Sequence, residues 1–61
     1  MSWSVLVEKD GQLHERPARD VAAALGVACL LLRDGIKVVG IEGPDGLRIS
    51  SEVIRSLCEK P

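Results

Sequence analysis

A chain of 61 residues is long enough for one small domain, residues 1–61. Its net charge is −1, so it lacks the excess of basic residues that would bind nucleic acid or an anionic membrane. Its hydrophobic content of 46% is typical of a folded rather than a disordered chain. A single aromatic residue, Trp3, excludes an RNA-recognition sheet, because such a sheet stacks bases on several aromatic side chains.

The N-terminal part of the chain is expected to form two strands joined by a tight turn. Residues 2–8 alternate apolar and polar side chains with the period of a strand. The turn residues Lys9-Asp10-Gly11 follow, and they precede a second strand expected from Gln12 to about Glu15.

Two loop geometries fit this turn, and they differ in strand register. A two-residue Asp-Gly loop would place Val7 opposite His14, whereas a three-residue loop with Gly11 in the left-handed region places Val7 opposite Leu13. We predict the three-residue loop, because only that register gathers the apolar residues on one face. They are Trp3, Val5, Val7 and Leu13.

The longest apolar run, Val21 to Leu32 (VAAALGVACLLL), predicts a central helix. We expect this helix to begin at Pro17 or Ala18, since the fixed φ of proline suits a first helical turn, and to continue to Asp34. Gly35 then closes it as a left-handed residue. The run is shorter than the roughly 20 residues that cross a bilayer and lacks signal-peptide features, so we expect a soluble, cytoplasmic protein.

A second hairpin is predicted after the central helix. Strands over residues 36–42 and 47–50 flank the turn Gly43-Pro44-Asp45-Gly46. A three-residue loop there pairs Ile41 with Ile49. This register directs four apolar residues to one face: Val39, Ile41, Leu47 and Ile49.

A short C-terminal helix completes the expected fold. Ser50 or Ser51 caps it, and its apolar side consists of Val53, Ile54, Leu57 and Cys58. The element order is ββαββα. We therefore predict an α+β domain in which an antiparallel sheet of two hairpins carries one long and one short helix on one face.

The sequence offers little for catalysis or metal binding. Free cysteines are usually buried, so we expect Cys29 and Cys58 to be two inward-facing thiols, with a disulfide between them as the less favoured alternative. His14 is the only histidine, and no Cys-x-x-Cys pair accompanies it. We predict no enzymatic activity, no metal and no cofactor.

The sheet is expected to have more apolar surface than the two helices cover. Its outer face should present Leu6, Ile36 and Val38, and a second copy of the chain would cover them. We therefore expect a protein-interaction module that forms a homodimer through these residues. The sheet face, an edge strand and the long helix all remain open as the interface.

The alternative is a weak nucleic-acid or anion-binding module. Arg16 and Arg19 flank the expected start of the long helix, where free N–H groups attract anions. Lys37 and Arg48 would complete the basic set. Neighbouring carboxylates balance the two arginines, so this alternative ranks second.

Overall fold

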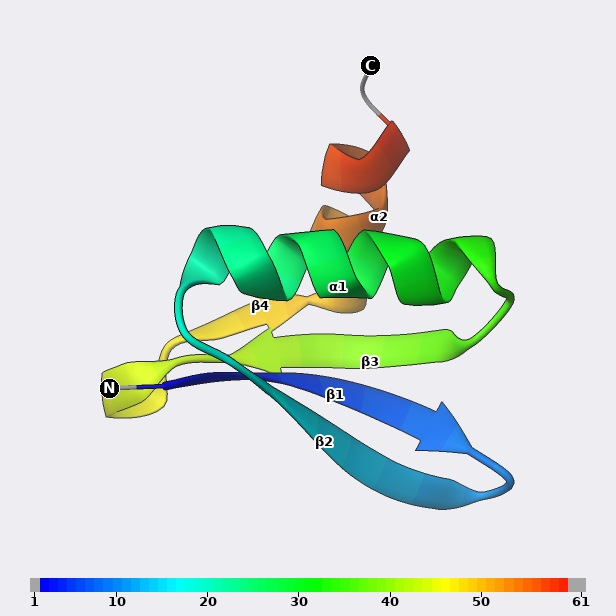
Figure 1. The fold of residues 1–61 in the computed structure, drawn as a ribbon, viewed down its shortest axis with the longest axis horizontal. Coiled ribbons are helices and arrows are strands. Elements are labelled where there is room, and N and C mark those ends of the chain that lie inside the picture. The colour runs from blue at the N-terminus through cyan, green and yellow to red at the C-terminus, as the bar shows by residue number, and fades with distance from the viewer. Residues whose placement is uncertain (1, 60–61) are drawn as a thin grey trace.

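Four antiparallel strands and two helices form the fold in the computed structural model, which describes residues 2–59 (Figure 1). The strand order across the sheet is β2-β1-β3-β4. The predicted α+β fold with the order ββαββα is confirmed. In chain order the elements are β1 (Trp3–Lys9), β2 (Gln12–Ala18), α1 (Val21–Arg33), β3 (Lys37–Glu42), the 3-10 turn η1 (Pro44–Gly46), β4 (Arg48–Ser50) and α2 (Ser51–Glu59).

The hydrophobic core lies between the helices and one face of the sheet, the inner face. Figure 1 shows α1 running alongside β3, whereas the β1–β2 hairpin extends away from both helices. The central strands β1 and β3 and the helix α1 supply most of the core, and α2 adds one residue. The buried residues are Val5, Val7, Ala24, Ala28, Leu31, Val38, Ile41 and Ile54.

The first hairpin has a two-residue loop, so the predicted three-residue loop is wrong. Lys9 pairs with Gln12, which places Val7 opposite His14. The loop residues Asp10 and Gly11 have φ values of 54° and 78°. Two positive φ values define a type I′ turn, whose twist matches that of the strands, and aspartate and glycine tolerate this conformation.

The second strand of this hairpin continues through Pro17 to Ala18, so the prediction that Pro17 opens the helix is wrong. β2 is an edge strand, where a missing N–H group removes no hydrogen bond from the interior of the sheet. The helix α1 begins at Val21 instead. Asp20 caps it, because its carboxylate accepts a hydrogen bond of 2.8 Å from the N–H group of Ala23.

The C-terminal end of α1 is closed as predicted, by Gly35 with a φ of 78°. The N–H group of Gly35 donates to the carbonyl of Leu32 at 3.1 Å, and that of Ile36 donates to the carbonyl of Leu31 at 3.0 Å. These two bonds form a Schellman motif. The chain therefore reverses sharply into β3.

A β-bulge at Val39 decides which side chains of β3 enter the core. Leu6 pairs with Gly40 but Val7 pairs with Val38, which leaves Val39 as an extra residue. One extra residue reverses the alternation of side chains on either side of it. Val38 is consequently 3% exposed in the core, whereas Val39 is 41% exposed. Val39 was expected on the inner face and Val38 on the outer face, and both expectations are wrong.

The second hairpin confirms the predicted pairing of Ile41 with Ile49. The N–H group of Gly43 donates to the carbonyl of Leu47 at 2.8 Å across the base of the Pro44–Gly46 loop. Leu47 itself is 54% exposed, so its expected place on the inner face is wrong. Leu47 lies between the Pro44–Gly46 loop and β4, outside the strand itself.

A disulfide joins Cys29 of α1 to Cys58 of α2, so the expectation of two free thiols is wrong. The two Cα atoms lie 5.5 Å apart, because α2 packs against α1 as well as against the sheet. Both cysteines are half-buried rather than part of the core. A link that spans 29 residues of chain stabilises the folded state by about 3.5 kcal/mol in the loop-entropy treatment.

Two glycines, Gly43 in a crowded position and Gly26 in an open one, provide a test of the packing around Trp3. A Cβ atom at Gly43 would lie 2.5 to 2.7 Å from carbons of the Trp3 ring. We expect Gly43→Ala to lower the free energy of unfolding by about 1–3 kcal/mol, because the ring must move. Trp3 is the only aromatic residue, so its fluorescence reports the displacement directly.

Gly26→Ala is the matched control. On the exposed side of α1 the added Cβ has no atom within 4 Å, so Gly26 is not needed for the close approach of another element. Alanine is favoured over glycine inside a helix by about 1 kcal/mol, so this variant should be more stable than the wild type. Urea unfolding followed by circular dichroism measures both. A Gly43→Ala protein with wild-type stability and fluorescence would contradict the Trp3 contact.

Candidate interaction surface

The face of the sheet that points away from the helices carries three exposed or half-exposed aliphatic side chains. Leu6 comes from β1, Leu13 from β2 and Val39 from β3. Leu13 is 65% exposed and is the most exposed large apolar side chain among the described residues. We call these three residues the outer sheet surface.

The outer sheet surface surrounds a hollow of about 360 Å³. Gly40 lies at the floor of the hollow. Because glycine has no side chain, the space between Leu6 and β4 stays open. A Cβ atom at Gly40 would lie 3.0 Å from the carbonyl oxygen of Ile49. The remaining lining comes from Arg48, Ile49, Ser50 and Ser51, at the junction of β4 with α2.

Charged residues of both signs border this apolar patch. Lys37 lies 3.9 Å from Glu8 on the neighbouring strand β1. Arg48 donates a hydrogen bond of 2.6 Å to the carboxylate of Glu42. All four side chains are well exposed, so each pair contributes little to stability. Together the two pairs place positive and negative charges side by side around the apolar residues of this face.

Only one of the three residues predicted for self-association lies on the outer sheet surface. Leu6 is there, but Val38 points into the core as a consequence of the bulge. Ile36 is half-buried and packs against the core where α1 turns into β3. The sequence reasoning missed Leu13 and Val39. The Asp10-Gly11 dipeptide was the signal for Leu13, since a type I′ loop directs it outward.

The four basic residues of the alternative hypothesis do not share a surface. Arg16 pairs with Val5 and so lies on the inner side of the sheet, whereas Lys37 and Arg48 lie on the outer side and contact carboxylates. Arg19 lies in the connection to α1. At the N-terminal end of α1 the carboxylate of Asp20 accepts from the N–H group of Ala23, and its negative charge disfavours a bound anion there.

His14 lies on the inner side of the β1–β2 hairpin, opposite Val7. It borders a hollow of about 260 Å³ together with Arg16, Leu31 and Ile36. The disulfide occupies both sulfur atoms, so His14 has no thiol to activate. Over residues 2–59 no three metal-ligating side chains gather at one point.

Neither α1 nor α2, the two α-helices of the described part of the chain, combines the length and hydrophobicity needed to cross a membrane. We compared the chain with protein-family models, with curated proteins and with solved structures, and found no match.

The neighbouring valines of β3 give a test of the bulge that shapes this surface. Val38→Ala removes two buried methyl groups, and we expect it to lower the free energy of unfolding by about 2 kcal/mol. Val39→Ala removes the same atoms from a half-exposed position and should cost well under about 1 kcal/mol. Chemical denaturation measures both. Equal losses, or a larger loss for Val39→Ala, would contradict the β1–β3 register.

Proposed function

We propose that this chain is a non-enzymatic protein-interaction module that forms a homodimer through the outer sheet surface. The observation that supports this most is the position of Leu6, Leu13 and Val39 around a hollow on the sheet face that no helix covers. Isolated exposed aliphatic residues are common on proteins, but a group of them around one hollow marks an interaction site.

The exposed area of the chain also supports a partner. The chain exposes 4426 Å² of surface. A compact monomer of this mass exposes roughly 3,900 Å², so the excess is about 500 Å². A stable interface buries about 800 Å² on each partner. An interface on the outer sheet surface would bury an area of the same order as this excess.

A second copy is the partner that the charges favour. On the outer face Glu15 lies at the β2 side, and Arg48 lies at the β4 side of the same sheet. A two-fold axis parallel to the strands would lay β2 of one copy over β4 of the other. Glu15 then lies near Arg48 of the second copy, offset by two residues along the strands and within reach of the long arginine side chain, twice in one interface, while the apolar patches meet at the centre.

The other two open interfaces fit less well. The edge strand β2 contains Pro17, which lacks the N–H group that pairing with another strand would use. On α1, Leu30 is 59% exposed, but its neighbours along that side of the helix are small, Ala22 and Gly26. The sheet face combines apolar area, a hollow and complementary charges.

We also propose that the protein is cytoplasmic and that it binds a further protein partner. The cytoplasm keeps most cysteines reduced, so in that compartment a bridge such as Cys29–Cys58 would form transiently. A homodimer of so small a domain would also gain stability from the core that the two copies share.

The test is a charge placed on the outer sheet surface. We expect the wild-type chain to sediment as a dimer at tens of micromolar and Leu13→Glu to sediment as a monomer, because each interface would then bury two carboxylates. Leu13 is mostly exposed in the single chain, so the variant should keep the wild-type circular dichroism spectrum.

Leu30→Glu is the matched control, since Leu30 has a similar exposure but lies on α1, on the other side of the molecule. It should leave the dimer intact. A monomeric wild-type chain at these concentrations would refute the proposal, as would a dimer that Leu30→Glu dissociates and Leu13→Glu does not.

A further inference from the structure

The C-terminal helix α2 packs on α1, β3 and β4 and is linked to α1 by the disulfide, but it adds only one fully buried side chain to the core. Ile54 is its only fully buried residue, whereas Val53 and Leu57 are 49% and 45% exposed. Its N-terminal end is held by a hydrogen bond of 3.4 Å from the N–H group of Val53 to the hydroxyl of Ser50. A helix of nine residues does not persist in water without tertiary contacts.

The remainder of the fold has a core of its own. Every hydrophobic core residue except Ile54 belongs to β1, β3 or α1. The sheet ladder joins β1 to β2 and β3 independently of α2. Loss of α2 from its position would therefore remove one side chain from the core and leave the sheet and α1 packed together.

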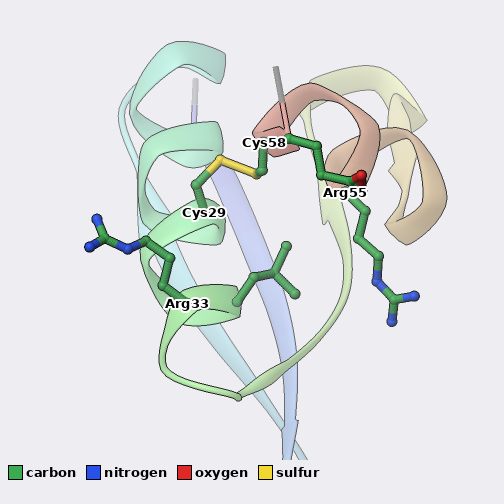
Figure 2. Close-up of a pocket in the computed structure, with 6 residues that line it drawn as sticks. Cys29, Arg33, Arg55 and Cys58 are labelled. Carbon is green, nitrogen blue, oxygen red and sulfur yellow. A yellow bond between two sulfur atoms is a disulfide. The ribbon is translucent and has the colours of Figure 1, made fainter. Parts of the chain in front are cut away.

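The bridge itself is open to reagents. Cys29 and Cys58 are half-buried and line a mainly apolar hollow of about 350 Å³ between α1 and α2. Figure 2 shows Arg33 and Arg55 on opposite sides of this hollow, with both guanidinium groups pointing away from the sulfur atoms. Neither arginine covers the bridge. A small thiol can reach it from solvent, and exposed disulfides are the ones that exchange readily.

From these three observations we propose that the Cys29–Cys58 disulfide is a reversible redox lock that holds α2 against α1. Thiol reduction opens the lock and releases α2, while the sheet and α1 remain folded. Release withdraws Ile54 and exposes the apolar side chains of α1, β3 and β4 that α2 contacts. The redox state of the chain thereby controls whether an apolar face is covered.

The reaction is thiol–disulfide exchange. A thiolate attacks one Sγ atom of the bridge and forms a mixed disulfide, the S–S bond between Cys29 and Cys58 breaks, and the other Sγ leaves as a thiolate that takes up a proton. A second thiolate attacks the reagent's sulfur in the mixed disulfide and forms a small-molecule disulfide with it, while the cysteine Sγ leaves as a thiolate that takes up a proton. Two electrons pass to the cysteines, and an oxidised small-molecule disulfide reverses the sequence.

Amide hydrogen exchange of the full chain, with and without millimolar reduced glutathione, tests the lock. We expect the protection of the α2 amides to fall on the order of 10–100-fold on reduction, because the bridge restrains only the short segment from Ser51 to Cys58 that reduction frees to move. Amides of α1, β1 and β3 should change only a few-fold. Oxidised glutathione should restore the original protection.

The double variant Cys29→Ser/Cys58→Ser is the control for the reagent. It should show the open α2 without any reductant and should not respond to glutathione. Three results would overturn the proposal: a bridge that glutathione does not reduce in the folded protein, a reduced chain whose α2 amides stay protected, and a reduced chain that loses protection throughout. The last result would make the disulfide a requirement of the whole fold rather than a lock on one helix.

Discussion

The packing of α1 against the two central strands is the contact on which the other features of this fold depend. Ala24 and Ala28 are fully buried, and their small side chains let the helix lie close to Val5 and Ile41. The Val39 bulge affects this contact, because it places Val38 instead of Val39 beneath the helix and keeps Lys37 on the outer face beside Glu8. The same bulge turns Val39 outward. One irregularity thus completes the core and creates part of the surface on the opposite face.

The two surfaces with functional interest lie on opposite layers of the molecule. The outer sheet surface belongs to hydrogen-bonded strands, the central strands β1 and β3 and the edge strand β2, so a second copy can meet it without rearrangement. The α1–α2 junction is different, because it is formed by side chains of two helices and closed by a covalent link that a thiol can open. Self-association would therefore use a preformed face, whereas the redox response would use a helix, α2, that is either docked or released. The two would act independently.

Sequence reasoning worked where a signal is local. Gly35 closes α1 because only a residue tolerant of positive φ fits there, and the Gly43–Gly46 turn placed Ile41 opposite Ile49 for the same kind of reason. It failed at Pro17, which suits both a first helical turn and an edge strand. Only the position of β2 at the edge of the sheet decides between the two.

The order of strands and helices, the C-terminal end of α1 and the turn at Gly43–Gly46 were determined by the sequence alone, since short-range backbone preferences govern them. The tertiary structure decided which side chains face inward and which cysteines meet. The bulge places Val38 in the core and Lys37 on the outer face, and no local sequence pattern around Val39 predicts it. The Cys29–Cys58 bridge likewise depends on two helices lying side by side, a relation between segments far apart in the chain.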